Sequence, residues 1–221
     1  MPLPVGANVP FRGRVRECAD LIGPAARLLD VGCSSAWLAP LVLGRVDRYV
    51  GLERSVEAVD RMDSRIALVS GTALQLPFPE SSFDAICLFD VIDHLPRGTE
   101  MTALQEAHRV LQPGGTLYFS TPHASLVHSP LDPVWLLGHR HYRRGTVRSL
   151  ISNANFEITR LFVAGGFVEG LDHIGHLAFK HLLKRQQPQV MLITRLIDGA
   201  HGTNRWLGMT VFAAANKPAP G

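Results

Sequence analysis

Long apolar runs and cysteines are both scarce in this chain. No stretch of the 221 residues reaches the roughly 18 apolar residues of a membrane-spanning helix. The first residues, Met1–Gly6, lack the charged and apolar regions of a signal peptide. The three cysteines, Cys18, Cys33 and Cys87, have no metal-site spacing, and two of them lie at the ends of apolar strands, so we expect buried, reduced thiols. Together these absences favour a cytoplasmic protein without a transmembrane segment.

The chain also has only a small excess of positive over negative charge. The chain carries 22 Lys and Arg against 19 Asp and Glu, which gives a net charge of +3. The basic residues are scattered, and their densest group is Arg140, Arg143, Arg144 and Arg148. A patch of this size favours a solvated helix start over a nucleic-acid track. We therefore expect no nucleic-acid partner.

Apolar runs that end in turn signals alternate with helical patterns along the chain. This alternation is typical of a doubly wound α/β sheet with helices on both faces, and the length suits one such domain, 1–221. We expect strands at 26–31, 46–52, 65–70, 83–89, 114–121, 156–163 and 205–215, and helices at 14–22, 35–43, 55–63, 99–111 and 144–153.

Two segments exceed this minimal sheet, the loop 122–144 and the amphipathic helical segment 165–202. We expect the choice of substrate to depend on them. The helical pattern of the second segment fits a core helix or a pocket lid, and it also fits a dimer face or a contact with a membrane surface. A monomer and a homodimer both remain open.

The segment 28–38, Leu-Leu-Asp-Val-Gly-Cys-Ser-Ser-Ala-Trp-Leu, places an acid and a tight turn between an apolar run and a helical pattern. A parallel strand that ends at a helix N-terminus gathers backbone N–H groups around a concavity that suits a carboxylate or phosphate. Glu53 closes the next apolar run about twenty residues on, where an acid can accept hydrogen bonds from ribose hydroxyls. These features predict a nucleoside-cofactor pocket at the carboxyl ends of the strands, although a turn that binds nothing shares the local pattern.

Four later segments distinguish the two cofactors that such a loop serves, the nicotinamide dinucleotides and S-adenosylmethionine. They read Gly-Thr-Ala-Leu-Gln-Leu-Pro-Phe at 71–78, Ser-Phe-Asp-Ala-Ile-Cys-Leu-Phe-Asp-Val-Ile-Asp-His-Leu at 82–95, Arg-Val-Leu-Gln-Pro-Gly-Gly-Thr-Leu at 109–117 and Ser-Thr-Pro at 120–122. In their order and spacing, the loop and these segments resemble the class I S-adenosylmethionine-dependent methyltransferases, specifically the small-molecule, methyltransferase type 11 like group. The resemblance is strong over residues 26–122 and weaker over 139–163.

The resemblance implies a Rossmann-like, seven-stranded sheet that is mostly parallel and has an antiparallel last strand. It also implies a site for S-adenosylmethionine, with Asp30 and the turn at the methionine end, Glu53 at the ribose, the Ala73 backbone beside the adenine and Asp90 beneath the sulfonium. The implied binding residues are Asp30, Gly32, Cys33, Ser34, Ala36, Glu53, Arg54, Thr72, Ala73, Leu74, Phe89 and Asp90.

The sequence departs from the family pattern at three positions. Ser34 and Ala36 stand where the turn usually has glycines, and Thr72 replaces an aspartate that would accept from the adenine amino group. Alanine at position 36 adds only a methyl group where helix and strand pack, whereas serine at position 34 is unfavourable if φ there is positive. A catalytically idle scaffold that binds a partner through 165–202 is therefore an alternative, and a NAD-dependent oxidoreductase is a weaker one.

Methyl transfer from a sulfonium requires alignment of the acceptor and, for hydroxyl acceptors, help from a general base. Histidine fits that task near neutral pH. Histidines at the expected pocket edges are His94, His123, His128, His139 and His141, and our candidate catalytic residues are His94, His139 and His141. A structural role for His94 and a solvated loop around the other two are the alternatives.

Two further patterns narrow the prediction. His173 and His181 would lie about 12 Å apart along a helix axis, so these two and His176 are not expected to share a metal. The chain reads Phe-Asp-Val-Ile at 89–92 and lacks the [DN]-P-P-[YF] segment of enzymes that methylate nucleic-acid amino groups. We predict an S-adenosylmethionine-dependent methyltransferase of a small molecule, acting at oxygen or, less favoured, at nitrogen or carbon.

Overall fold

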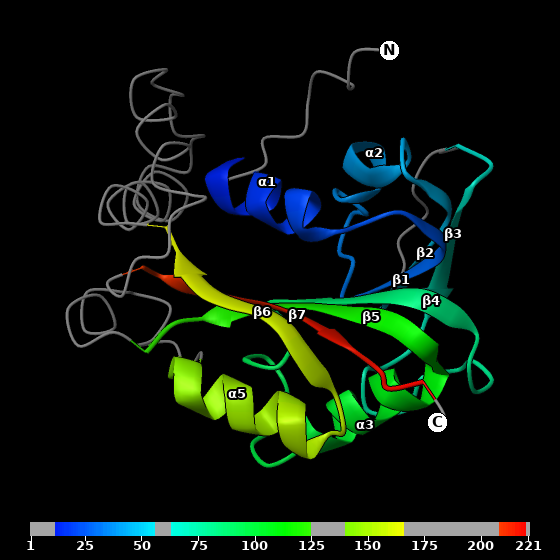
Figure 1. The fold of residues 1–221 in the computed structure, drawn as a ribbon. Helices are drawn as coiled ribbons and strands as arrows, with labels where there is room; N and C mark the ends of the chain where they lie inside the picture. Colours follow the sequence, from blue (N-terminus) through cyan, green and yellow to red (C-terminus); the bar gives the residue numbers. More distant parts are fainter. Residues whose placement is uncertain (1–11, 56–62, 125–139, 166–207, 220–221) are drawn as a thin grey trace.

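The computed structural model of the protein describes residues 12–55, 63–124, 140–165 and 208–219. One seven-stranded sheet runs through it in the order β3-β2-β1-β4-β5-β7-β6 (Figure 1). Its strands are β1 (Ala25–Val31), β2 (Val46–Glu53), β3 (Ile66–Ser70), β4 (Phe83–Phe89), β5 (Leu111–Pro122), β6 (Glu157–Ala164) and β7 (Thr210–Asn216). Strand β7 is antiparallel to both of its neighbours, and β1 to β5 pair in parallel. The predicted doubly wound sheet with an antiparallel last strand is confirmed.

Helices cover both faces of this sheet. α1 (Arg12–Leu21) and α2 (Ala39–Val42) lie on one face, and α3 (Glu100–Val110) and α5 (Arg144–Asn153) lie on the other (Figure 1). The central strands β1 and β4 are buried on both sides, as is typical of parallel sheets between two helical layers. Among the described residues, no helix combines the length and the apolar character needed to span a membrane. The expected helix 55–63 and the segment 165–202 lie almost wholly outside the described residues.

The turn after β1 differs from its prediction. Gly32, Ser34 and Ala36 have φ values of 75°, 50° and 53°, which belong to the left-handed region. Right-handed helical residues cannot have these values, so the expected helix 35–43 was wrong in its first half, and α2 begins only at Ala39. The substitution at position 36 therefore acts through backbone conformation as well as packing, because a non-glycine residue in this region costs about 1–2 kcal/mol.

The β4–β5 pairing contains a large irregularity at Pro-Gly-Gly. Phe83 pairs with Leu111, whereas two residues later Ala85 pairs with Thr116. The extra residues of β5 loop out, and Gly114, with φ 77°, donates its N–H to the Lys217 carbonyl over 2.8 Å. β5 thus starts at Leu111, three residues before the predicted start at 114. β7 starts at Thr210, whereas the predicted strand starts at 205; residues 205–207 of that prediction lie outside the described residues.

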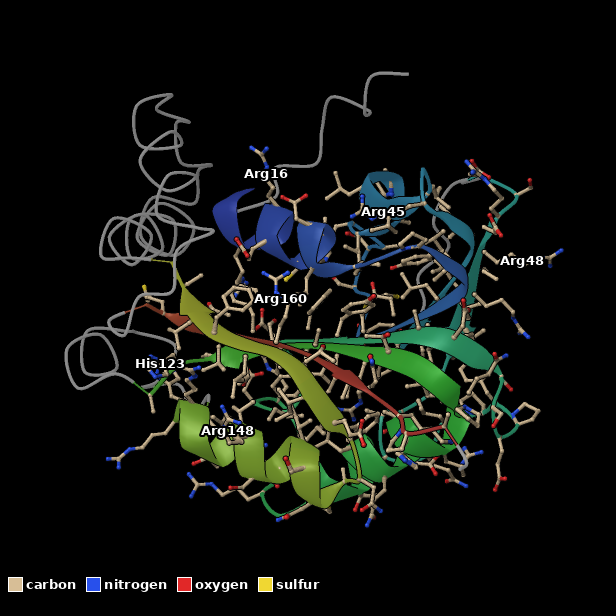
Figure 2. The ribbon with its side chains drawn as sticks, viewed as in Figure 1. Arg16, Arg45, Arg48, His123, Arg148 and Arg160 are labelled. Carbon is tan, nitrogen blue, oxygen red and sulfur yellow. The ribbon has the colours of Figure 1, made fainter. Side chains whose placement is uncertain are left out.

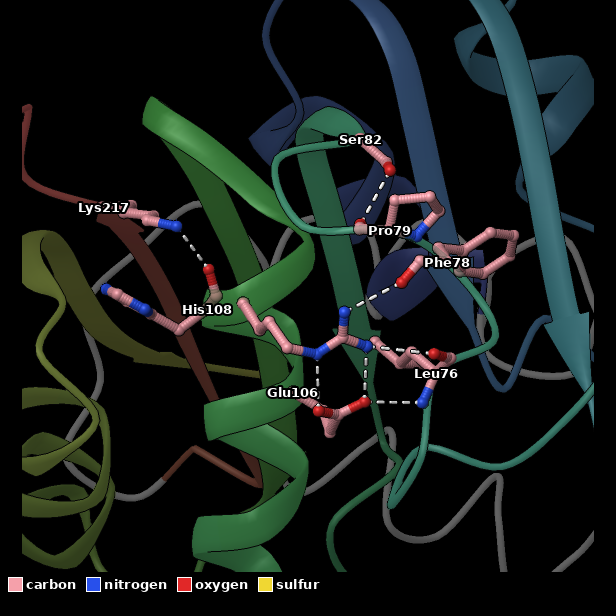
Figure 3. Close-up of polar contacts among 8 residues, drawn as sticks. Leu76, Phe78, Pro79, Ser82, Glu106, His108 and Lys217 are labelled. Carbon is pink, nitrogen blue, oxygen red and sulfur yellow. Dashed lines mark hydrogen bonds and ion pairs between the residues drawn. The ribbon is translucent and has the colours of Figure 1, made fainter.

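Glu106 connects two of the sequence segments that carry the resemblance, 71–78 and 109–117 (Figure 3). Its carboxylate accepts from the Arg109 guanidinium at 2.8 Å and from the Leu76 N–H at 2.7 Å. Arg109 also donates to the carbonyls of Phe78 at 2.9 Å and Leu76 at 3.0 Å. These bonds tie the loop that follows β3 to helix α3 and thereby fix one wall of the cavity described next.

Candidate active site

A cavity of about 690 Å³ opens where β1 to β4 end. Parallel α/β sheets bind ligands at this edge, and pockets of roughly 300–1,000 Å³ enclose drug-sized ligands, so the volume suits a nucleoside cofactor. The wall includes the candidate base His94 and eight of the implied binding residues: Gly32, Ser34, Glu53, Arg54, Thr72, Ala73, Leu74 and Asp90. Sequence reasoning missed the rest of the wall, which is largely apolar: Val31, Leu52, Gly71, Val91, Leu95 and Pro96.

Glu53 lies at the end of β2 with its carboxylate facing the turn after β1. One carboxylate oxygen, Oε2, accepts from the Ser34 N–H at 3.1 Å, and Oε1 accepts from the Arg54 N–H at 2.8 Å. A carboxylate offers about four lone-pair positions, so about two remain for hydroxyl donors of a ligand. The residues therefore fit an adenosine-bearing group, because Glu53 can accept from a vicinal diol while its own geometry is fixed by the backbone.

Thr72 accepts with its Oγ1 from the Leu74 N–H at 3.3 Å. This bond stabilises a tight turn in which Thr72 and Gln75 form an isolated β-bridge. The hydroxyl that replaces the family's aspartate is thus engaged in holding the wall, and the apolar side chains of Ala73 and Leu74 lie along the same wall.

Asp30 lies behind the cavity wall and does not line it. Its side chain is 2% exposed, in the layer between the sheet and helices α1 and α2, and it accepts from the Tyr49 hydroxyl. Burial raises the Asp30 pKa to about 7, against the lowering effect of the Tyr49 hydrogen bond and with a further increase from Glu53. Sequence reasoning could not find Tyr49, which stands in an apolar strand and looks like an ordinary core residue.

Because the Asp30 pKa is raised by burial, we expect the free energy of unfolding to depend on pH. Folded Asp30 keeps its proton up to about pH 7, whereas an unfolded aspartate loses it near pH ~4. The folded state therefore binds more protons between these values, and the free energy of unfolding should fall as the pH rises from about 4 to about 7. In Asp30→Asn, whose amide oxygen can still accept from Tyr49, urea unfolding measured between pH 5 and 8 should show a flatter profile. An equal slope in the variant would assign the effect to another group.

Three other implied residues are also buried behind the wall. Cys33 is 1% exposed, Ala36 is fully buried and Phe89 is 7% exposed. A Cβ atom on Gly51 would meet the Cys33 sulfur at 2.7 Å, so the glycine in β2 makes room for this side chain. All three cysteines are free and buried, and burial raises the pKa of each thiol, which confirms the expected buried thiols.

Asp90 forms part of the cavity wall directly after β4. Its φ is 52°, its backbone N–H donates to the Ser120 carbonyl at 3.0 Å, and its Oδ1 accepts from the Ser120 hydroxyl at 3.1 Å. Its other oxygen, Oδ2, pairs with the Arg14 guanidinium of α1 at 3.0 Å. Sequence analysis gave no signal for Arg14, because an arginine in an N-terminal amphipathic helix is usually a solvated residue.

His94 lies on the cavity wall beside a buried acid. The Nε2 atom of His94 lies 3.4 Å from Oδ2 of Asp93, whose side chain is 2% exposed. Burial lowers the His94 pKa, and the charges of Arg14 and Arg140 lower it further, while Asp90 and Glu53 raise it. A histidine with a lowered pKa is neutral near pH 7, and with a proton on Nε2 directed to Asp93 it can accept a proton at Nδ1.

Of the other candidate histidines, the structure describes His123 and His141, and neither lines the cavity. His123 directly follows β5, and its Nδ1 lies 2.8 Å from the Gly208 carbonyl (Figure 2). His141 is half-buried near His123. His128, His139, His173, His176 and His181 lie outside the described residues.

Arg140 braces the loop that carries His94. Its guanidinium donates to Glu100 of α3 and to the carbonyls of Ile92 and Leu95, the latter at 2.6 Å. Tyr142 is buried and donates to the same Glu100 carboxylate at 3.0 Å. Arg140 is the first residue of the densest basic group in the sequence. It therefore braces the loop that carries His94 and is not part of a solvated helix start.

The family model described as a methyltransferase domain matches residues 29–119. The ubiquinone/menaquinone biosynthesis C-methyltransferase UbiE of Methylobacterium nodulans is 38% identical over 115 residues, which cover 50% of this chain and 44% of that protein. The 27-O-demethylrifamycin SV methyltransferase of Amycolatopsis mediterranei is 32% identical over 101 residues, which cover 41% of this chain and 36% of that protein. The chain spans about half or less of the length of the curated relatives that it matches.

Solved structures share the fold over nearly the whole chain. The N-methyltransferase NodS from Bradyrhizobium japonicum matches with a TM-score of 0.61 at 17% identity, covering 96% of this chain and 98% of that one. The [4+2]-cyclase SpnF matches with a TM-score of 0.62 at 19% identity, covering 94% of this chain and 80% of that one. At these identities the likeness concerns the fold alone.

Proposed function

The chain belongs to the class I S-adenosylmethionine-dependent methyltransferases, and on this premise we propose that it transfers a methyl group to an oxygen atom of a small molecule. The observation that carries the proposal is the cavity at the strand ends, where the Glu53 carboxylate is held by two backbone N–H groups and keeps acceptor positions for a ribose diol. The cofactor, when bound, supplies an electrophilic methyl group on a sulfonium.

The residues of this chain would perform three tasks in such a reaction. Glu53 would hold the ribose, and the turn containing Gly32 and Ser34 would approach the methionine end with its backbone. The apolar part of the wall would exclude water from the reacting centre, which favours displacement over hydrolysis. His94, oriented by Asp93, would accept the proton of a hydroxyl acceptor as the oxygen attacks.

Two features favour oxygen as the acceptor atom. A histidine that is neutral near pH 7 and paired with a buried carboxylate suits deprotonation of a hydroxyl, whereas an amine acceptor arrives with its own lone pair. One matched relative is named for an O-demethylated substrate, although another is named as a C-methyltransferase. The cytoplasmic location, the single domain over 1–221, the absence of a nucleic-acid partner and the choice between monomer and homodimer stay predictions.

A catalytically idle scaffold is the second candidate, since Ser34 and Ala36 both hold left-handed conformations without glycine and the fold also occurs in a cyclase. Thermal unfolding with added ligand separates the candidates. A ligand present at 100 times its Kd stabilises a folded protein by about 2.7 kcal/mol, which corresponds to a rise in Tm of roughly 5–10 °C for a domain of this size. We expect this rise with S-adenosylhomocysteine and none with NAD.

The outcomes of that experiment are distinct. No rise with either ligand at millimolar concentration would favour the idle scaffold, and a rise with NAD alone would favour an oxidoreductase. Asp47→Ala is a control for the removal of an acidic side chain from β2 outside the cavity. Asp47 is exposed and lies at the opposite end of this strand from Glu53. This variant should show the same rise in Tm as the unmodified protein.

A further inference from the structure

Asp90 is fixed from two sides at the floor of the cavity. Ser120 of β5 donates its hydroxyl to one carboxylate oxygen at 3.1 Å, and Arg14 of α1 pairs with the other at 3.0 Å. The Asp90 side chain is 19% exposed and that of Arg14 is 30% exposed, so the pair is partly withdrawn from water. Charges in such surroundings act on their neighbours more strongly than charges in bulk solvent.

Helix α1 holds Arg14 in place through contacts at its carboxyl end. Arg45 donates to the carbonyls of Ala19 and Ile22, the second at 2.9 Å, and the Tyr118 hydroxyl accepts from the Gly23 N–H at 2.9 Å. Figure 2 shows Arg45 near this end of the helix, while Arg16 extends away from the protein on the solvent side. The helix that carries Arg14 is therefore held at its carboxyl end by bonds that do not depend on the ion pair.

The charges of both Asp90 and Arg14 change the His94 pKa. The charges that act on it are Asp90 at the floor, Arg14 paired with Asp90, Glu53 from β2, Arg140 from the segment before α5, and Asp93 at 3.4 Å. The Asp90 charge raises the His94 pKa and the Arg14 charge lowers it, so the two effects oppose each other. Arg14 lies outside the region 29–119 that the family model matches, so a residue beyond the shared region holds the floor residue Asp90.

We propose that Arg14 is a positioning residue of this active site, which fixes the Asp90 carboxylate and balances its negative charge beside His94. The proposal rests on the proposed function for its catalytic meaning. Without Arg14, the Asp90 charge is uncompensated, and the protonated form of His94 is favoured. A protonated histidine cannot take a proton from an acceptor hydroxyl, so helix α1 would extend the activity of the enzyme toward lower pH.

The test is the NMR titration of the His94 imidazole in the full chain, with His94→Gln to assign its signal. In Arg14→Met the His94 pKa should rise by roughly half a unit to one unit, because about one opposing charge has been removed at close range. In Asp90→Asn it should fall, and in Arg14→Met/Asp90→Asn it should return close to its original value. Arg14→Lys should retain the original value, since the positive charge is kept.

Arg16→Met is the matched control, because Arg16 lies on the same helix with a side chain that is 73% exposed. Its His94 titration should match the unmodified protein. An unchanged His94 pKa in Arg14→Met, or equal shifts in Arg14→Met and Arg16→Met, would overturn the proposal. The titration needs no turnover, so failure of the methyl-transfer assay would reject the proposed function and leave this result interpretable by itself.

In the active enzyme the same variants should move the acidic limb of the kcat/KM profile. Arg14→Met should shift it upward by the change seen in the titration, so activity near pH 6 should fall several-fold while activity near pH 9 changes little. Equal losses at all pH values would indicate a structural role for Arg14 and contradict the proposal.

Discussion

Replacing Glu53 with alanine is expected to weaken the binding of S-adenosylhomocysteine by about a hundredfold or more. The variant loses the acceptor of two ribose hydroxyls, and hydrogen bonds to a charged group contribute about 1.5–3 kcal/mol each. A loss of about 3 kcal/mol already corresponds to more than a hundredfold in Kd. The Ser34 and Arg54 N–H groups also lose their partner, and the loss of the Ser34 bond removes one of the bonds that hold the turn against β2. Titration calorimetry at pH 7.5 measures the effect.

Two variants separate the diol contact from the support of the turn. Glu53→Gln keeps one carbonyl acceptor and should show an intermediate loss of affinity, whereas Asp47→Ala, on the exposed end of the same strand, should bind as the unmodified protein does. An affinity in Glu53→Ala within threefold of the unmodified protein would contradict the assignment of the ribose to this carboxylate.

Replacing His94 with alanine is expected to lower kcat for a phenolic acceptor by about a hundredfold near pH 7, because general bases typically contribute 10²-fold or more. The Kd of S-adenosylhomocysteine should change by less than about threefold, because the imidazole acts on the acceptor and the Asp93 partner lies outside the cavity wall. Activity should recover as the pH rises toward the pKa of the phenol, about 10 for an ordinary phenol, since the ionised acceptor needs no base. Steady-state kinetics between pH 6 and 10 measure this dependence.

Asp93→Asn tests how the imidazole is oriented. The amide can still accept from the His94 ring but does not stabilise its protonated form, so we expect a smaller loss of kcat than in His94→Ala. A loss in His94→Ala that persists at high pH, or an equal loss of donor affinity, would assign His94 to the structure of the wall instead of to proton transfer.

Most of the fold follows from local sequence patterns. Buried parallel strands are continuous apolar runs, and β1, β2 and β4 could be located from such runs because helices cover both of their sides. The acid at the end of β2 could be predicted from its spacing to the turn after β1, and Glu53 does line the cavity. Local patterns are sufficient to predict an element when its position depends on its own residues and not on contacts with distant ones.

Other features depend on contacts between distant residues and left no local signal. Asp30 lies in the interior because Tyr49, nineteen residues later, provides its hydroxyl, so the acid of the loop faces the helical layer and not the cavity. The left-handed conformation of Ser34 and Ala36 is imposed by the surrounding structure against residue preference. The pairing of Arg14 with Asp90 joins segments that are far apart in the chain.

A crystal structure of the protein with S-adenosylhomocysteine tests whether this cavity binds the methyl donor. We expect the adenosine to occupy the cavity, with both ribose hydroxyls within about 3 Å of the Glu53 carboxylate and the sulfur near Asp90 and His94. Crystals grown at saturating ligand in which this cavity contains only solvent, or in which the ligand lies elsewhere on the protein, would contradict the proposed site and the function that depends on it.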